Sequence, residues 1–132
     1  MKIAIVDDST SVRMMIKICL DDLGVQDDHI YEFSSAIEAL NDFQNNNYDL
    51  VFCDLHMPEM NGDELVEKIS ASMQHIKMAD IVIVSGEEGS EYKHVFKKFG
   101  VDKFIKKPIK TPSFIHHIKP LIDKINIRKK SF

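Results

Sequence analysis

The sequence predicts an α/β domain in which helices cover both faces of a doubly wound, five-stranded parallel sheet. Short apolar segments alternate along the chain with longer segments in which apolar residues recur at helical spacing. An unbroken apolar run is typical of a strand buried on both faces, and strands that alternate with helices are typical of a parallel sheet. A length of 132 residues, with 44% hydrophobic and 29% charged residues, suits one globular domain with its own core.

Five segments are predicted as strands because each is short, apolar and followed by polar or turn-forming residues. The third is the clearest, since four apolar residues, 50–53, lead directly into Asp54, and Pro58 and Gly62 then break the chain. Asp54 is therefore expected at the carboxyl end of a central strand, where open α/β sheets place their functional groups. The predicted strands are residues 2–6, 28–33, 50–54, 81–84 and 103–106.

Five helices are predicted between and after these strands. Ser9 or Thr10 can cap the first helix, and Ser34 or Ser35 can cap the second, because short polar side chains accept hydrogen bonds from the first helical amides. The predicted helices begin near residues 10, 36, 63, 92 and 112, and the first four end near residues 23, 44, 73 and 99.

The end of the chain is predicted to leave the helical pattern. Pro120 lies inside the last helix and removes a backbone donor, so we expect a kink or a break there. Apolar residues recur at helical spacing up to residue 125, and three basic residues, 128–130, follow. We therefore predict one domain over residues 1–126 and a short basic tail over residues 127–132.

Composition favours a cytoplasmic protein. The longest apolar runs have four or five residues, too few to span a membrane, and a strand pattern stands at the N-terminus in place of a signal peptide. Cys19 and Cys53 both lie in apolar patterns, which predicts two reduced thiols in the core.

Charge is distributed unevenly along the chain. Residues 1–92 hold 5 Lys or Arg and 19 Asp or Glu, a net charge of −14, whereas residues 93–132 hold 12 and 2, a net charge of +10. Two solvated surfaces that merely differ in charge would explain this. We favour an acidic site in the first part and a basic contact face in the second, formed by the fourth helix, the fifth strand and the fifth helix.

Four of the predicted strands end in residues that carry chemistry. The carboxyl ends of parallel strands meet at one edge of a sheet, which brings together Asp7, Asp8, Asp54, Ser85 and Lys107. Three carboxylates in close proximity repel one another, and a hard divalent cation removes that penalty. Mg²⁺ suits carboxylate oxygens and retained waters.

The expected magnesium site uses both side-chain and backbone oxygens. Asp8 and Asp54 are predicted as direct ligands, Asp7 as a ligand through water, and the backbone carbonyl of His56 as a further ligand. A capping role for the acidic pair at residues 7 and 8 is the alternative.

The same set of groups suits phosphoryl transfer. A carboxylate can act as the nucleophile and form an aspartyl phosphate, here at Asp54. The cation, the Lys107 ammonium and the Ser85 hydroxyl can each meet an oxygen of the transferred group. Lys106 is an alternative to Lys107, because successive strand residues point to opposite faces and only one of the two reaches the site easily.

The order and spacing of these residues resemble the receiver domain of bacterial response regulators, over essentially the whole chain. The choice of Lys107 over Lys106 rests on this resemblance, since Lys107 stands immediately before Pro108. The motifs are Asp7-Asp8, Glu38-Ala39-Leu40, Tyr48-Asp49-Leu50-Val51 leading to Asp54, Met57-Pro58, Gly62, Ser85-Gly86 and Lys107-Pro108.

The resemblance implies a CheY-like, flavodoxin-like fold with strand order 2-1-3-4-5. It implies that Asp54 accepts a phosphoryl group from a histidine kinase or a histidine phosphotransfer protein, with Mg²⁺ required. It further implies a switch pair, Ser85 and Phe104, and a cis peptide bond before Pro108. His56 and Glu87 occupy variable positions that tune the lifetime of the phosphate in this family.

The protein would act as a signalling switch of a two-component pathway or phosphorelay, with no separate enzymatic output domain. We expect it to work in trans as a chemotaxis-type or adaptor regulator, as a monomer or a phosphorylation-dependent homodimer. A phosphate shuttle is the alternative. An aspartyl phosphohydrolase is disfavoured, because the second Asp it needs is replaced by His56 after Asp54 and by Ser9 after Asp7.

Other classes fit the sequence less well. A flavin-binding module would have a phosphate loop after the first strand, where this chain has two carboxylates, and a degenerate receiver would lack residue types that are all present here. Nucleic acid is not an expected partner, because the acidic part of so small a domain would repel a polyanion. No membrane association is expected.

Overall fold

The computed structural model of the protein describes residues 1–86 and 91–130. Its five parallel strands lie in the order β2-β1-β3-β4-β5, so the predicted fold class and strand order are confirmed. Strand β3 is buried at all five positions, as the apolar run at residues 50–53 predicts. The strands are β1 (Ile3–Val6), β2 (Ile30–Phe33), β3 (Leu50–Asp54), β4 (Ile81–Ser85) and β5 (Lys103–Lys106).

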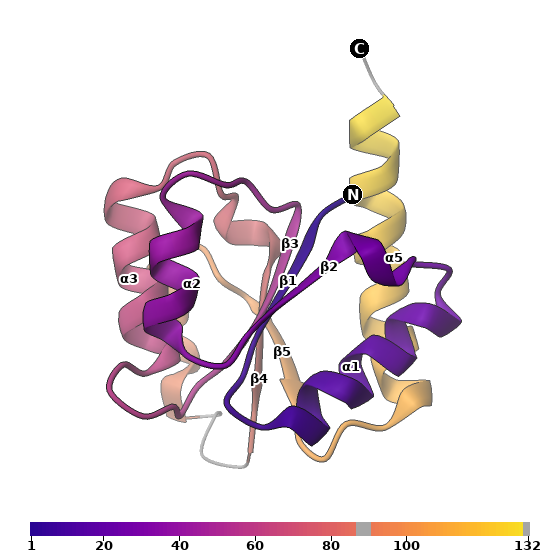
Figure 1. The fold of residues 1–132 in the computed structure, drawn as a ribbon, viewed down its shortest axis with the longest axis horizontal. Helices are drawn as coiled ribbons and strands as arrows, with labels where there is room; N and C mark the ends of the chain where they lie inside the picture. Colours follow the sequence, from indigo (N-terminus) through magenta and orange to yellow (C-terminus); the bar gives the residue numbers. More distant parts are fainter. Residues whose placement is uncertain (87–90, 131–132) are drawn as a thin grey trace.

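Helices cover the sheet on both faces. Figure 1 shows the sheet nearly edge-on, with α2 and α3 on one side and α1 and α5 on the other. Helix α4 packs on the side of α2 and α3, since its buried Phe96 belongs to the core on that face. The helices are α1 (Thr10–Asp22), α2 (Ala36–Phe43), α3 (Gly62–Ser72), α4 (Lys93–Lys97) and α5 (Thr111–Lys130), with single 3₁₀ turns η1 (Asp27–His29) and η2 (Met78–Asp80).

Two hydrophobic cores lie on the two faces of the sheet, and alternate side chains of β3 contribute to each of them. Val51 and Cys53 belong to the core under α2, α3 and α4. Phe52 belongs to the core under α1 and α5, where its ring stacks on Phe114 at 5.5 Å between centroids. Because successive side chains of a strand point to opposite faces, both faces need apolar residues and only the strand end is open to polar groups. Asp54 occupies that end.

The prediction for the cysteines is confirmed: Cys19 and Cys53 are both buried, and they form no disulfide with each other.

The second predicted strand is shorter than expected. Residues 27–29 form the turn η1, and β2 begins only at Ile30. The three polar residues of this turn have no apolar face to bury, so they do not extend the strand.

Helix α5 is longer and more continuous than the sequence predicts. It runs without a break from Thr111 to Lys130, past Pro120. The proline costs one backbone hydrogen bond, but its ring faces solvent, and the buried Ile118 and Leu121 hold the helix to the sheet on either side of it. The prediction of a break is therefore wrong.

Residues 127–130, which the sequence predicts as a basic tail, form the last turn of α5. Arg128 donates a hydrogen bond of 2.7 Å to Oδ2 of Asp80, a carboxylate in a residue only 5% exposed. Lys129 donates one of 3.1 Å to Oδ1 of Asp49. Asp80 and Asp49 immediately precede β4 and β3. Ion pairs thus continue the helix beyond the point where its apolar pattern ends.

Among the described helices, none combines the length and the apolar character that crossing a membrane requires.

Candidate functional site

The edge formed by the carboxyl ends of β1, β3 and β5 carries a compact charged cluster. Lys107 Nζ lies 3.0 Å from Oδ1 of Asp54 and 3.1 Å from Oδ2 of Asp7. Asp7 is 1% exposed and Asp54 is 5% exposed. Three residues that are up to 100 positions apart in the sequence therefore meet at one place, as the strand-end pattern predicts.

Backbone and side-chain contacts hold Asp7 at this edge. The amide of Ser9 donates to Oδ1 of Asp7 at 2.8 Å, and Arg13 donates to the Asp7 carbonyl oxygen at 2.7 Å. Ser9 also caps α1, since its hydroxyl accepts from the amide of Val12. The first helix and the first carboxylate of the site are thus fixed by the same short loop.

Asp7, Asp8 and Asp54 are arranged so that they can hold a metal ion. One carboxylate oxygen from each lies within 4.8 Å of the others. Oδ2 of Asp7 is buried and accepts no hydrogen bond, although it lies close to the Lys107 ammonium. A buried acceptor left without a hydrogen bond is unusual in a protein. A hard divalent cation bound by oxygen ligands would satisfy it, so these residues fit Mg²⁺.

Burial and neighbouring charge disfavour ionised Asp54. Its pKa is raised above the usual range, first by burial and then by the charge of Asp7, while Lys107 opposes both effects. The pKa of Lys107 is also raised: burial works against its charge, but the hydrogen bond to Asp54 and the two carboxylate charges outweigh burial. The cluster therefore carries more negative charge than one lysine neutralises, and a divalent cation would relieve it.

The structure distinguishes Lys107 from Lys106. Lys106 is the last residue of β5, is exposed, and aligns with Ser85 across the sheet. Lys107 turns into the cluster, and its amide donates to the Ser85 carbonyl oxygen at 2.7 Å. The peptide bond between Lys107 and Pro108 is cis, in agreement with the resemblance.

The two residues expected to form a switch lie on adjacent strands. Ser85 ends β4 and is 5% exposed. Phe104 lies in β5, partly buried, with its ring edge-on to Phe96 at 5.9 Å and the Lys93 ammonium 5.4 Å from its centre. Phe104 therefore contacts α4 directly, and the described contacts of its ring come from that helix.

His56 is exposed on the loop after β3, and its ring meets Tyr92 edge-on at 5.9 Å. Glu87, the other residue expected to tune phosphate lifetime, lies outside the described residues. The sequence pattern predicts only that the fourth helix begins near Tyr92. A pair 36 residues apart leaves no signal in a single sequence, because neither periodicity nor spacing reports ring contacts.

Gly62 brings α3 against the end of β3 more closely than any other residue type allows. A Cβ atom at this position would lie 2.2 Å from the carbonyl oxygen of Asp54 and 3.2 Å from Sγ of Cys53. The Gly62 amide also donates to the Leu55 carbonyl oxygen at 2.8 Å. Sequence reasoning identified this glycine as a turn former and as part of the family pattern, but missed its close approach to Asp54.

The comparisons with known proteins agree with this geometry. The profile of the response regulator receiver domain family matches residues 3–119, and the chain belongs to that family. It is a receiver domain of two-component signalling. The chain is similar to a chemotaxis protein CheY homolog of Campylobacter jejuni, with 36% identity over 116 residues, which cover 87% of this chain and 86% of that protein.

Two further relatives extend the comparison. Chemotaxis protein CheY1 of Helicobacter pylori is 34% identical over 116 residues, covering 87% of this chain and 90% of that protein. The crystal structure of a CheY-like response regulator receiver domain protein from Methanospirillum hungatei superposes with a TM-score of 0.78 at 27% identity, over 96% of this chain and 97% of that one.

Proposed function

We propose that the protein is a phosphorylation-dependent switch, in which Asp54 accepts a phosphoryl group from a phosphohistidine of a kinase or phosphotransfer protein. The observation that carries this proposal is the contact of Lys107 Nζ with Asp54 and Asp7 at the edge of the sheet. An ammonium at this position would meet the charge that develops on the transferred group. The free, buried cysteines fit the cytoplasmic location expected for such a pathway.

Each residue of the site has a separate part in this proposal. The Asp54 carboxylate attacks the phosphorus atom, and the donor histidine nitrogen leaves. Lys107 contacts an oxygen of the transferred group, and Ser85 donates its hydroxyl hydrogen to another. Asp8, Asp54 and the His56 carbonyl would hold Mg²⁺, with Asp7 acting through water; bound Mg²⁺ supplies electrostatic stabilisation of the phosphoryl oxygens.

The test of the function is phosphorylation in vitro. Incubation with acetyl phosphate and Mg²⁺ should add one phosphoryl group to the intact protein, seen by mass spectrometry, and no addition should occur when Mg²⁺ is chelated. A protein that stays unmodified under conditions in which a related CheY protein is labelled would contradict the proposal.

Asp8→Asn is expected to weaken Mg²⁺ binding by about tenfold or more, because the substitution removes a charged ligand and keeps its shape. Mg²⁺ titration by calorimetry provides the measurement. Asp63→Asn, a change of the same kind in the first turn of α3, is the matched control and should bind Mg²⁺ almost as wild type does. Equal affinities of the Asp8 variant and wild type would place the metal elsewhere.

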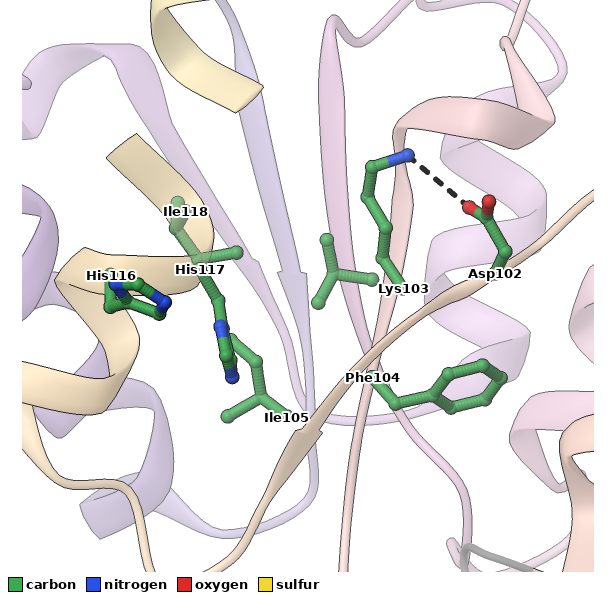
Figure 2. Close-up of a pocket in the computed structure, with 8 residues that line it drawn as sticks. Asp102, Lys103, Phe104, Ile105, His116, His117 and Ile118 are labelled. Carbon is green, nitrogen blue, oxygen red and sulfur yellow. Dashed lines mark hydrogen bonds and ion pairs between the residues drawn. The ribbon is translucent and has the colours of Figure 1, made fainter. Parts of the chain in front are cut away.

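We further propose that the response is read on the basic face made of α4, β5 and α5. Phe104 lies in this face and contacts α4, so a movement at Ser85 has a short path to it. Figure 2 shows a pocket in which His116 and His117 of α5 lie opposite Lys103 and Ile105 of β5. Its volume is about 350 Å³, enough for one or two side chains of a partner segment. The lysines assigned to this face are Lys93, Lys97, Lys98, Lys103, Lys106, Lys110, Lys119 and Lys124.

The charge of this face suits an acidic partner segment. Complementary charge mainly raises the association rate and specificity, and exposed charges are screened within about 10 Å at 0.1 M salt. Lys97 and Lys98 are exposed at the end of α4, away from the phosphorylation site. Their charge can therefore be reversed without altering Asp54.

Lys97→Glu/Lys98→Glu is expected to slow partner association by about tenfold at low salt and to remove most of its salt dependence. The partner is first captured with protein held in Mg²⁺ and beryllofluoride, identified, and then titrated by surface plasmon resonance. Lys68→Glu/Lys77→Glu makes the same change in net charge on other exposed lysines and should associate as wild type does. If Lys97→Glu/Lys98→Glu associates with the partner as wild type does, the basic face is only a solvated surface. If wild type associates with itself and this variant does not, the partner is a second copy of the chain.

A further inference from the structure

Arg13 of α1 joins the loop after β1 to the edge strand β2. Its Nη1 atom donates to the backbone carbonyl oxygen of Asp7 at 2.7 Å, and its Nε atom donates to Oε1 of Glu32 at 3.0 Å. A guanidinium presents its donors in a rigid planar fork, so the two acceptors are held in a fixed orientation relative to each other. The Arg13 side chain is only 14% exposed, and it therefore forms a partly buried link between the loop and the sheet.

The contact with Asp7 bears on Asp8 through the peptide bond between them. That bond is planar, so the carbonyl oxygen of Asp7 and the Cα atom of Asp8 lie in one plane. Asp7 has other supports, since Ser9 donates to its carboxylate at 2.8 Å and Lys107 lies 3.1 Å from it. The Asp8 side chain is exposed and forms no hydrogen bond or ion pair with the residues that the structure describes. Its direction therefore depends on the peptide plane that Arg13 holds.

Glu32 fixes the other end of this link. It also accepts a hydrogen bond of 3.1 Å from Lys17, one turn beyond Arg13 on α1. Burial alone would raise the pKa of the Glu32 carboxyl, but the hydrogen bonds from Lys17 and Arg13 outweigh burial and lower it. A charged carboxylate accepts a stronger hydrogen bond from a guanidinium than a neutral acceptor does. The guanidinium is thus anchored to β2, which pairs with β1 next to the site.

We propose that Arg13 is a positioning residue, which orients the peptide between Asp7 and Asp8 so that the Asp8 carboxylate faces the site it shares with Asp54. The inference rests on the proposed function, in which Asp8 is a metal ligand. Mg²⁺ requires near-ideal octahedral geometry, so a small rotation of one ligand weakens binding. The alternative is that Arg13 only attaches α1 to β2. Lys17 shares that attachment, and its described ion pairs do not include Asp7.

The experiment measures Mg²⁺ affinity by calorimetry and the urea midpoint of the same samples. Arg13→Met keeps an unbranched apolar stem and removes every donor. It is expected to bind Mg²⁺ about tenfold more weakly than wild type, as loss of a group that orients a metal ligand commonly does. Loss of a positive charge near an acidic site would by itself strengthen cation binding. Weaker binding therefore reports the position of Asp8 and not the change in charge.

Lys17→Met is the matched control for this variant. It removes the same charge from the same helix and from the same carboxylate of Glu32, but leaves the contact with the Asp7 carbonyl oxygen intact. It should bind Mg²⁺ as wild type does, whatever its urea midpoint.

Arg13→Lys separates the two contacts of the guanidinium. A lysine side chain ends one atom short of Nη1, so its ammonium can keep the ion pair with Glu32 but does not reach the Asp7 carbonyl oxygen as arginine does. This variant should have a urea midpoint close to that of wild type and should still bind Mg²⁺ at least about threefold more weakly.

A double-mutant cycle tests whether Arg13 acts through Asp8. In an Asp8→Asn background, Arg13→Met should weaken Mg²⁺ binding by less than about twofold. Wild-type affinity in Arg13→Met, an equal loss in Lys17→Met, or full additivity with Asp8→Asn would overturn the inference. Should Arg13→Met fail to fold, wild-type affinity in Arg13→Lys would overturn it as well. A wild-type protein that binds Mg²⁺ but is not labelled by acetyl phosphate would instead refute the proposed function.

Discussion

Asp54→Asn is expected to abolish phosphorylation by acetyl phosphate, the largest functional effect of any single change in this chain. An amide nitrogen and carbonyl are far poorer nucleophiles than a carboxylate, so no acyl phosphate forms. The substitution keeps the shape of the side chain, and the Asp54 carboxylate is already unfavourable in its buried, negatively charged surroundings. The folded state should therefore persist, with a urea midpoint equal to or above that of wild type. Intact mass and a denaturation curve on the same sample provide both measurements.

A neighbouring carboxylate provides the control for this prediction. Asp63→Asn changes an acidic residue in the first turn of α3 that is not among the carboxylates paired with Lys107. It should be labelled to the same extent as wild type. If Asp54→Asn were labelled as fully as wild type, the acceptor would be another residue, and peptide mapping of the label would identify it.

The strands and their ends were predictable because burial on both faces requires unbroken apolar runs. The boundary errors have a different origin. Residues 127–130 have no apolar pattern, yet they are helical because Arg128 and Lys129 pair with Asp80 and Asp49 at the start of two strands. The first of these ion pairs joins residues 48 positions apart in the sequence, and the second joins residues 80 positions apart. Such distant pairs leave no local pattern from which a helix could be predicted.

In the candidate site too, some contacts were predictable from the sequence and others were not. Asp7, Asp54 and Lys107 were predictable as neighbours, because topology alone brings the ends of parallel strands to one edge. The choice of Lys107 over Lys106 required the family resemblance, since strand alternation permits either. The contact of His56 with Tyr92 depends on how a loop and a helix start approach each other, and no pattern in the sequence reports that distance.

Gly62→Ala is expected to destabilise the protein by about 3 kcal/mol, at the upper end of the cost of overpacking a close contact. Helix propensity alone predicts the opposite sign, because alanine in a helix is about 1 kcal/mol more favourable than glycine. The contact decides the outcome. A methyl group would lie 2.2 Å from the Asp54 carbonyl oxygen, which is backbone and cannot rotate away as a side chain can. Either α3 moves outward or the end of β3 shifts, and in both cases the acceptor loses its place against Lys107.

Two measurements distinguish this steric effect from a general loss of glycine. Gly24→Ala is the matched control: Gly24 has φ of +83°, but a Cβ there meets nothing within 4 Å, so only backbone strain of about 1–2 kcal/mol is expected. Urea denaturation should show a larger loss of stability in Gly62→Ala than in Gly24→Ala. Acetyl phosphate labelling of the folded protein should be at least about tenfold slower than wild type in Gly62→Ala and unchanged in Gly24→Ala, because a displacement of about 1 Å in a reacting group costs that much or more. Labelling of Gly62→Ala at the wild-type rate would mean that α3 yields while Asp54 stays in place, so that the close approach of Gly62 serves packing and not the position of the acceptor.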